Sequence, residues 1–304
     1  MSLQDFGTIS PQDAERLSER QINWWLEYRK IKNEQGHPLD FRQHLFLYDI
    51  YADFSPLLVC KKAAQVGFST LAILKTLWAA RYLGMDIIYT LPTDSDVGSF
   101  VGSKVNRIVA QNPILQEYVK DRDTIEQKRV GAQIIYYRGT FTNRAALMVS
   151  SDLNVHDEVD RSNQANVAAY ASRLQHSKHQ WQWYFSNPST PTNGVGKLWE
   201  ESDKREWVIQ CGTCKAPQTL MWPSSIDPEQ ERYRCIHCDA TLSDDDRRVG
   251  IWRPTGEGKY SGYHISLLMA PWTPAAKVLE LERSKAPDYF ANFVLGEPYA
   301  LTDL

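Results

Sequence analysis

The chain has 304 residues, enough for one large core or for a core with a smaller module. With 42% hydrophobic and 23% charged residues, it has the composition of a globular protein. Its formal net charge of −3 excludes a uniformly basic nucleic-acid-binding protein. Any contact with nucleic acid must therefore come from a local patch. No stretch reaches the roughly 18 apolar residues of a membrane span, and the N-terminus lacks the apolar run of a signal peptide, so we expect a cytosolic protein without a membrane partner.

The first segment, residues 1–55, is predicted to be helical. In SPQDAERLSERQINWWLEYRKIKN, Ser10 has the position of an N-cap and Pro11 that of the first helical residue. Apolar residues then recur at roughly helical spacing, and DFRQHLFLYDIYADF has a similar amphipathic pattern. We therefore expect an N-terminal helical region before the main fold.

From residue 56 onward, short strand-like runs alternate with helix-length segments. The runs are PLLVC, MDIIYTLPT, AQIIYYRGT, LNVHDEVD and WQWYFSNPS, and the helix-length segments cover 69–83 and 95–120. Such alternation indicates βαβ units and a mostly parallel sheet. We assign an α/β core to residues 56–205, an insertion to 206–242, and a closing strand and helix with a linker to 243–304.

The stretch KAAQVGFST at 62–70 has the glycine and hydroxyl residues of a phosphate-binding loop, but Phe68 stands where the usual G-x-x-x-x-G-K-[ST] pattern has lysine. Such a loop binds phosphate through backbone N–H groups and the N-terminus of the following helix. We expect Lys62 to reach the β- and γ-phosphates from the near end of the loop, and Ser69 to ligate Mg²⁺. The predicted nucleotide site also includes Gln65, Val66, Gly67, Phe68 and Thr70. The alternative is an ordinary strand-to-helix turn with surface lysines.

The sequence LNVHDEVDR at 153–161 has two acidic residues at the end of a predicted strand. Alternation along the strand would turn Asp157 and Glu158 to opposite faces. We predict that Asp157 holds Mg²⁺ through water and that Glu158 polarises the water that attacks the phosphate. A solvated acidic strand end is the alternative, but together with the preceding loop the pair favours an ATPase.

A third motif, WYFSNPSTPTNG, ends an apolar strand with hydroxyl and amide side chains, Ser186, Asn187, Ser189 and Thr190. Side chains of this kind at a strand tip can sense a γ-phosphate by hydrogen bonding and pass the signal on. The alternative is a proline-containing turn.

Four of the five cysteines form two C-x-x-C pairs separated by twenty residues, the spacing of a zinc ribbon. The predicted Zn²⁺ ligands are Cys211, Cys214, Cys235 and Cys238. Two such pairs complete a tetrahedron of thiolates, which leaves no open position for a substrate and indicates a structural role. We expect His237 to be a bystander and Cys60 to be a buried apolar residue.

Taken together, these motifs resemble the ATPase region of the large terminase subunit of lambda-like tailed bacteriophages. The resemblance runs from about residue 38 to 300 and includes KKAAQVGFST, VHDEVDR, FSNPSTPTNG, CGTC…CIHC and FANFVLGEPY in the family's order. It implies a mostly parallel P-loop ATPase core of the ASCE type with N-terminal helices and an inserted zinc ribbon. It also implies an enzyme that hydrolyses ATP with Mg²⁺ and translocates double-stranded DNA into a capsid.

The resemblance carries roles over to individual positions. It implies phosphate contact for Lys62, Mg²⁺ binding for Ser69, the Walker B acid for Asp157, and the catalytic carboxylate for Glu158. The segment from Ser186 to Thr190 corresponds to the coupling motif.

Two further expectations follow from the family. Gln43, in FRQHLF, resembles the adenine-recognition region. Gln65 stands where some relatives have an arginine, so an arginine finger is expected from elsewhere. A neighbouring subunit is one source, and Arg144 and Arg138 are candidates within the chain.

The implied partners are double-stranded DNA, gripped by its phosphate backbone, a small terminase subunit, the capsid portal, and further copies in a homo-oligomeric ring in the host cytoplasm. The family's nuclease domain follows the ATPase, and because the chain has no further acidic cluster suited to a nuclease, we expect no DNA cleavage. The alternatives are a helicase-like DNA translocase and a catalytically inert, zinc-stabilised DNA-binding or assembly module.

Overall fold

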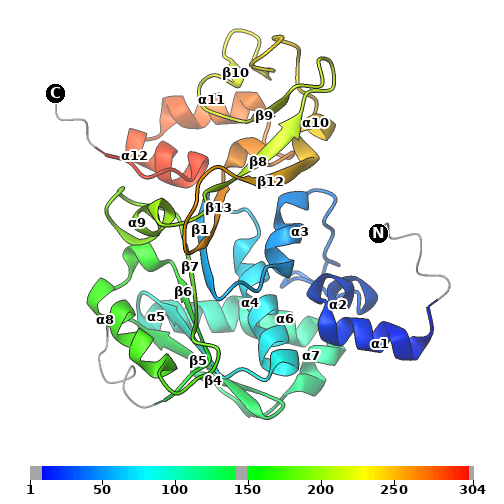
Figure 1. Ribbon diagram of the computed structural model, residues 1–304, viewed down its shortest axis with the longest axis vertical. Helices are drawn as coiled ribbons and strands as arrows, with labels where there is room; N and C mark the ends of the chain where they lie inside the picture. Colours follow the sequence, from blue (N-terminus) through cyan, green and yellow to red (C-terminus); the bar gives the residue numbers. More distant parts are fainter. Residues whose placement is uncertain (1–8, 142–148, 301–304) are drawn as a thin grey trace.

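A mixed β-sheet runs through the protein (Figure 1). The computed structural model describes residues 9–141 and 149–300, and within these ranges eleven strands form this sheet. The order across the sheet is β12 (Gly250–Pro254), β8 (Arg205–Gln210), β13 (Ser261–Ile265), β1 (Leu57–Lys62), β7 (Trp181–Ser186), β6 (Leu153–Asp157), β2 (Ile87–Leu91), β5 (Gln133–Gly139), β4 (Gln127–Val130) and β3 (Val119–Asp123), with β9 (Pro217–Thr219) paired to β8.

The six neighbouring strands from β13 to β5 are parallel to one another, which confirms the predicted mostly parallel sheet. β7 follows β6 in the chain but lies between β6 and β1. Antiparallel strands extend both edges. The sequence pattern does not predict these edge strands because runs such as QKRV in β4 contain too few apolar residues to alternate.

Helices cover both faces of the parallel strands (Figure 1). Their bounds are α4 (Phe68–Trp78), α5 (Asp94–Phe100), α6 (Asn106–Gln111), α7 (Pro113–Tyr118), α8 (Gln164–Tyr170) and α9 (Gly194–Glu200). Alternation in β1 assigns the faces, because Leu58 and Cys60 pack in the core that includes α4 to α7, whereas Val59 packs with Val167 of α8 and Val195 of α9. No helix in the described ranges is long and apolar enough to cross a membrane.

The predicted N-terminal helices are α1 (Pro11–Arg20), α2 (Ile22–Tyr28) and α3 (Leu45–Ala52). The hydroxyl of Ser10 accepts a hydrogen bond from the backbone N–H of Asp13, which confirms the predicted N-cap. α3 begins later than its amphipathic pattern suggests. Asp40 accepts hydrogen bonds from the backbone N–H and the guanidinium of Arg42, and this local turn competes with helix formation.

The predicted helical segment 95–120 is divided into three helices. A π-helical turn (Val101–Val105) joins α5 to α6, and Asn112 is extended, with φ −126° and ψ 103°. The ring of Pro113 disfavours helical geometry at the residue before it, so α6 ends and α7 begins at Pro113.

The cysteine-bearing segment lies at the β12 end of the sheet, beside the C-terminal helices (Figure 1). The segment also contains β10 (Ile226–Asp227) and β11 (Arg232–Tyr233), and it is followed in the chain by α10 (Asp244–Arg248), α11 (Ala275–Ser284) and α12 (Pro287–Tyr289). The buried guanidinium of Arg247 donates to the carbonyl groups of Leu268, Ala270 and Pro271. The hydroxyl of Tyr233 donates to the carbonyl of Thr273, so the segment is tied to the loop before α11.

Two polar residues in β6 are fully buried. Asn154 donates to the carbonyl of Tyr170, and Nδ1 of His156 lies 2.8 Å from the hydroxyl of Thr90. Nε2 of His156 has no hydrogen-bond partner within the described residues. Burial lowers the pKa of His156 to about 3, so the folded protein holds a neutral imidazole.

This buried imidazole predicts a stability that falls in acid. Between pH 6.5, the unfolded pKa, and pH 3, the unfolded chain binds a proton that the folded chain excludes. Stability is therefore fully present above pH 6.5, and its loss approaches about 1.4 kcal/mol per pH unit below it. The free energy of unfolding, measured with urea, should decrease between pH 7 and pH 5 in both the wild type and His156→Asn. The decrease should be about 2 kcal/mol larger in the wild type. Equal decreases in both proteins would contradict this assignment.

Candidate nucleotide site and cysteine cluster

The carboxyl ends of the parallel strands bring three predicted motifs to one edge of the sheet. In register, Cys60 of β1 pairs with Phe185 of β7, and Phe185 pairs with Asp157 of β6. Strands in a sheet are about 4.8 Å apart, which puts the backbone of Asp157 roughly 10 Å from that of Cys60. The loop after β1, the acidic pair after β6 and the polar segment after β7 therefore leave the sheet beside one another.

The loop itself leaves β1 at Lys62 and enters α4 at Phe68. Two of its residues have a positive φ, 57° at Gln65 and 79° at Gly67. Glycine adopts the left-handed region without the steric cost that a Cβ imposes, which accounts for Gly67 at the start of the helix. Val66 is buried in the core and anchors the middle of the loop.

The backbone N–H groups divide into two sets. Those of Ala63 and Ala64 donate to the carbonyl groups of Ile265 and Phe293, at 2.6 and 2.8 Å. Those of residues 65–70 have no hydrogen-bond partner within the described part of the chain. Unpartnered N–H groups in a loop that leads into a helix N-terminus form an anion site, so this part of the loop can bind phosphate.

The two lysines of β1 point to opposite faces of the sheet. Lys61 is buried, forms an ion pair with Glu297, and lies with Nζ 4.5 Å from the ring centroid of Trp199. Nζ of Lys62 lies 5.9 Å from the ring centroid of Phe68, on the side of the loop. Of these two lysines, Lys62 is therefore the one available to a bound anion.

Phe68 fills the position that lysine has in the usual motif. Its ring is buried and packs against Phe185 in an edge-on arrangement, with 4.8 Å between centroids. Because this side chain points into the core, no cation can extend from that position. The ammonium group of Lys62 lies beside the same ring and can supply the missing charge.

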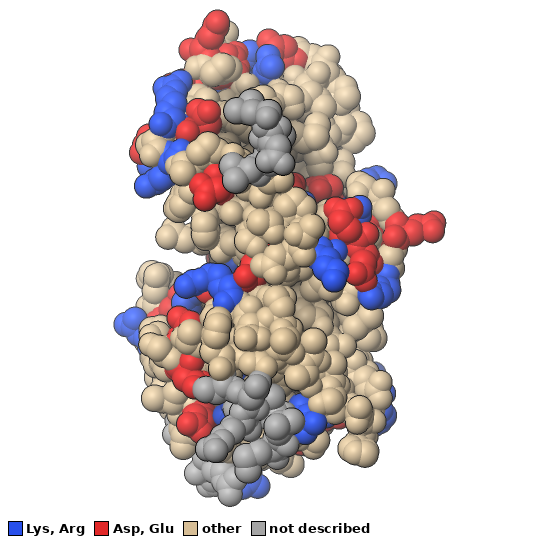
Figure 2. Space-filling model, turned by 90° about the vertical axis from the view of Figure 1, so that its left-hand side faces the viewer, with Lys and Arg blue, Asp and Glu red and all other residues tan. Residues whose placement is uncertain are grey.

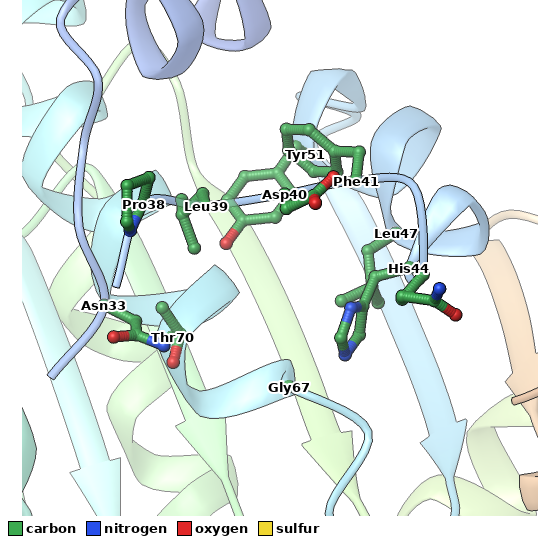
Figure 3. A pocket seen from close by; sticks show the side chains of 11 residues that line it. Asn33, Pro38, Leu39, Asp40, Phe41, His44, Leu47, Tyr51, Gly67 and Thr70 are labelled. Carbon is green, nitrogen blue, oxygen red and sulfur yellow. The ribbon is translucent and has the colours of Figure 1, made fainter. Parts of the chain in front are cut away.

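A cavity of about 230 Å³ lies between the loop, α3 and the segment before α3 (Figure 3). Its lining includes apolar and aromatic side chains together with a few polar groups: Asn33, Pro38, Leu39, Asp40, Phe41, Gln43, His44, Leu47, Tyr51, Gly67 and Thr70. Gln43, predicted from the sequence, is thus brought beside the loop. Burial lowers the pKa of His44, which favours its neutral form.

The two hydroxyl residues at the start of α4 differ in their contacts. The hydroxyl of Ser69 has no hydrogen-bond partner among the described residues, and its side chain is half-buried. The hydroxyl of Thr70 donates to Oε2 of Glu34 at 3.1 Å, and Thr70 lines the cavity. Ser69 is therefore free to ligate a metal, whereas Thr70 is tied to the N-terminal region.

The acidic pair does not follow strand alternation. Asp157 is the last residue of β6 and is 5% exposed, but Glu158 has a φ of 53° and has left the strand. The expected arrangement on opposite faces of a strand is therefore wrong, because the chain turns at Glu158. Oδ1 of Asp157 accepts from the backbone N–H of Glu158, while the partly exposed carboxylate of Glu158 pairs with Arg161 at 2.9 Å.

The segment after β7 is bonded both to the loop and to the acidic turn. Nδ2 of Asn187 donates to the carbonyl of Lys62 at 2.7 Å. The hydroxyl of Ser186 accepts from the backbone N–H of Asp160, and Ser189 donates to the carboxylate of Asp160. Among the residues that the structure describes, Thr190 forms a hydrogen bond through its carbonyl, which accepts from the backbone N–H of Asn193.

Of the two arginine candidates, the structure describes only Arg138, and its guanidinium is bonded to nearby carbonyl groups. Nη1 of Arg138 donates to the carbonyl groups of Glu126 and Tyr137, at 2.9 and 2.8 Å. Arg144 lies outside the described residues.

A tyrosine that the sequence pattern did not single out supports Asp157. The hydroxyl of Tyr89 donates to Oδ2 of Asp157 at 2.6 Å, and burial raises the pKa of Tyr89 well above its usual value, so the phenol keeps its proton. Tyr89→Phe should lower the free energy of unfolding by about 1.5–3 kcal/mol, because this hydrogen bond goes to a charged group. Urea unfolding measures the change.

Tyr137 offers a matched control for this prediction. It pairs with Tyr89 in register and is equally buried, but its hydroxyl has no hydrogen-bond partner within the described residues. Tyr137→Phe should therefore leave the free energy of unfolding unchanged or raise it. An equal decrease in the free energy of unfolding in the two variants would show that the hydrogen bond to Asp157 does not contribute to stability.

The four cysteines of the C-x-x-C pairs converge, with all four sulfur atoms within 4.8 Å of one another. Sγ of Cys211 lies 3.9 Å from that of Cys238, and Sγ of Cys214 lies 3.7 Å from that of Cys235. A tetrahedron with Zn–S distances of about 2.3 Å has sulfur atoms about 3.8 Å apart. Two of the sulfur–sulfur distances match this value, so the four sulfur atoms are suitably placed to hold a zinc ion.

The surroundings of the cluster also suit thiolate ligands. The backbone N–H groups of Thr213 and His237 lie 3.4 Å from the sulfur atoms of Cys211 and Cys235. Nε2 of His237 lies 3.3 Å from the carbonyl of Pro217, and His237 does not belong to the cluster among the described residues. Cys60 is fully buried in the sheet, as its sequence position suggests.

Comparison with known proteins identifies the fold and the family. The large terminase ATPase domain of Thermus phage P74-26 aligns with a TM-score of 0.56 at 11% identity, over 87% of this chain and 95% of that domain. The large terminase of another thermophilic bacteriophage aligns with a TM-score of 0.51 at 11% identity, over 85% of this chain. The chain spans only 53% of that second protein. No curated protein matches the chain in sequence.

The sequence model of one protein family, described as phage terminase large subunit gpA, ATPase domain, matches residues 55–257. That region contains the loop, the acidic pair, the segment after β7 and all four clustered cysteines. This match and the shared fold confirm the resemblance drawn from the motifs. The chain therefore belongs to the family of phage terminase large subunits and contains their ATPase domain.

Proposed function

We propose that this chain is the motor ATPase of a viral terminase, which hydrolyses ATP with Mg²⁺ and translocates double-stranded DNA into a capsid. The observation that carries the proposal is the meeting of four features at one edge of the sheet. These are the unpartnered N–H groups of residues 65–70, the ammonium of Lys62, the acidic pair, and the cavity beside the loop.

ATP would bind with its base in the cavity and its phosphates on the loop. Leu39, Phe41 and Leu47 offer apolar contacts to adenine, and Gln43 offers an amide that can hydrogen-bond to its edge. Gly67 and Thr70 line the same cavity and begin α4, so the α- and β-phosphates would follow directly onto the loop.

The phosphates would be neutralised from the near end of the loop. The N–H groups of residues 65–70 would cradle the β-phosphate, and Lys62 would approach the β- and γ-phosphates across the ring of Phe68. Ser69 and Asp157 would hold Mg²⁺, and the ion would supply positive charge beside the phosphates.

Glu158 would activate the attacking water. Its carboxylate is partly exposed and leaves the sheet next to Asp157, so a water molecule can lie between it and a γ-phosphate. The water oxygen bonds to the γ-phosphorus, its proton passes to Glu158, and the bond to the bridging oxygen breaks to release ADP. The segment after β7 would respond to this loss of the γ-phosphate, because Asn187 is hydrogen-bonded to Lys62 and Ser189 to Asp160. Its coupling residues would be Ser186, Asn187, Ser189 and Thr190.

The cysteine cluster would hold a structural Zn²⁺ within the segment 206–242, between the core at 56–205 and the closing part at 243–304. Double-stranded DNA would be gripped by its phosphates, which needs positive charge but no base-reading motif. Lys and Arg are interspersed with Asp and Glu on the face drawn in Figure 2, so this face offers no uniformly basic track. The DNA channel would instead be formed by several copies in a ring. The capsid portal and a small terminase subunit would complete the motor in the host cytoplasm.

Nucleotide binding tests the proposal directly. ATP that binds only the folded chain should raise the free energy of unfolding by about 2.7 kcal/mol at a hundredfold excess over its Kd. Thermal unfolding with and without ATP and Mg²⁺ measures the shift, which Lys62→Ala should largely abolish. Lack of any shift with ATP in the wild type would contradict the proposal. Low basal hydrolysis would not, because an arginine from the next subunit can contribute about 10³–10⁵ in rate.

A further inference from the structure

Asp160 lies two residues after Glu158, and its carboxylate accepts hydrogen bonds from two positions of the segment 186–195. Oδ1 accepts from both the backbone N–H and the hydroxyl of Ser189, each at 2.8 Å. Oδ2 accepts from the backbone N–H of Val195 at 2.8 Å, in the first turn of α9. No cation pairs with this carboxylate in the described part of the chain, so its charge is balanced by these donors.

The backbone of Asp160 makes two further bonds to the same region. Its N–H donates to the hydroxyl of Ser186 at 3.3 Å, and its carbonyl accepts from Nδ2 of Asn193 at 3.0 Å. Gly194 has a φ of 44°, and a Cβ there would lie 2.2 Å from Oδ2 of Asp160. The segment 186–195 is thus folded closely around this one carboxylate.

The carboxylate of Glu158, by contrast, is only weakly fixed by its own contacts. Its carboxylate is 41% exposed, and its ion pair with Arg161 lies on the surface. Exposed pairs of this kind contribute about 0–1 kcal/mol. The position of Glu158 therefore depends on the turn at 159–161, and the carboxylate of Asp160 ties that turn to the segment 186–195.

We propose that Asp160 is a positioning residue that holds the turn carrying Glu158 against the segment 186–195, so that the segment's movement shifts the catalytic carboxylate. This inference rests on the proposed function, which assigns Glu158 its role. The segment 186–195 is also hydrogen-bonded to the phosphate loop, because its Asn187 donates to the carbonyl of Lys62. A change at the loop can therefore reach Glu158 through Asn187 and Asp160.

The isosteric variant Asp160→Asn tests this role. Its side chain has one acceptor oxygen and one NH₂ group, so in either orientation the NH₂ faces a backbone N–H, that of Ser189 or of Val195. We expect kcat for ATP hydrolysis to fall about 10–100-fold, the scale of a misplaced catalytic group, while KM for ATP stays unchanged.

Asp152 provides the matched control at the other end of β6. Its carboxylate also accepts from a backbone N–H, that of Asp86 at 3.0 Å, and from a hydroxyl, that of Ser177 at 2.5 Å. Because a hydroxyl can also accept a hydrogen bond, Asp152→Asn can turn its oxygen to the N–H of Asp86 and its NH₂ group to Ser177, and it should leave kcat unchanged. A fall in kcat of the same size in both variants would assign Asp160 a purely structural role and overturn the proposal.

A milder variant covers the case in which Asp160→Asn does not fold. Ser189→Ala removes one donor to Asp160 and should lower kcat by less than Asp160→Asn, again without a change in KM. Wild-type kcat in Ser189→Ala and in any folded Asp160→Asn would overturn the proposal. If Glu158→Gln also hydrolysed ATP normally, the proposed function itself would fail, so the two failures can be told apart.

Discussion

Glu158→Gln should reduce ATP hydrolysis by about 10²–10⁴-fold, the usual contribution of a general base. The amide has nearly the same shape as the carboxylate but cannot take a proton from water. ATP binding should survive, because the loop and the cavity do not include this side chain. Single-turnover hydrolysis, measured beside ATP-dependent thermal stabilisation, separates the two effects.

Glu200 provides the control for this prediction. It is also a glutamate with a basic partner, Lys204, but it is more exposed and lies at the end of α9. Glu200→Gln should hydrolyse ATP at the wild-type rate. Wild-type hydrolysis in Glu158→Gln would instead rule out the proposed catalytic site, and loss of nucleotide binding in that variant would indicate that Glu158 acts in binding.

Removal of the proposed zinc should cause the largest decrease in the free energy of unfolding among the changes considered. The four-thiolate cluster can be closed by one ion, and structural zinc sites contribute about 10–16 kcal/mol of apparent binding free energy in isolated zinc fingers. Even part of this contribution predicts that chelation lowers Tm by on the order of 10 °C. Elemental analysis should find one zinc ion per chain, and Cys235→Ser should reduce that content and Tm together.

His237 serves as the control because it lies inside the second C-x-x-C pair without belonging to the cluster among the described residues. His237→Ala should retain zinc and the wild-type Tm. A wild-type chain that contained no zinc and was unaffected by chelators would contradict the metal assignment. The hydrogen bonds from Arg247 and Tyr233 to the loop before α11 would then keep this segment in place without a metal.

Much of the site could be predicted because its chemistry lies in short contiguous motifs. The loop at 62–70, the acidic pair and the two C-x-x-C pairs each place their key residues within ten positions of one another. The alternation of strand-like runs with helix-length segments also sufficed to predict parallel strands, and parallel strands bring such motifs to a common edge.

The contacts between motifs could not be predicted in the same way. The cavity is closed by side chains from 33–51 that meet the loop only in the folded chain, and of these only Gln43 was singled out. Tyr89 lies in no motif, and Asp160 lies within VHDEVDR but has no role assigned by it. The importance of both residues depends on which carboxylate or N–H group lies opposite. The turn at Glu158 was missed because a positive φ at a glutamate has no sequence signal.

The most direct measurement is a crystal structure of the chain with Mg²⁺ and a non-hydrolysable ATP analogue. We expect the triphosphate on the N–H groups of residues 65–70, Nζ of Lys62 within hydrogen-bond distance of the β- or γ-phosphate, and Lys61 still paired with Glu297. A triphosphate bound elsewhere, with the side chain of Lys62 turned to solvent, would contradict the assignment of the displaced lysine and with it the motor ATPase.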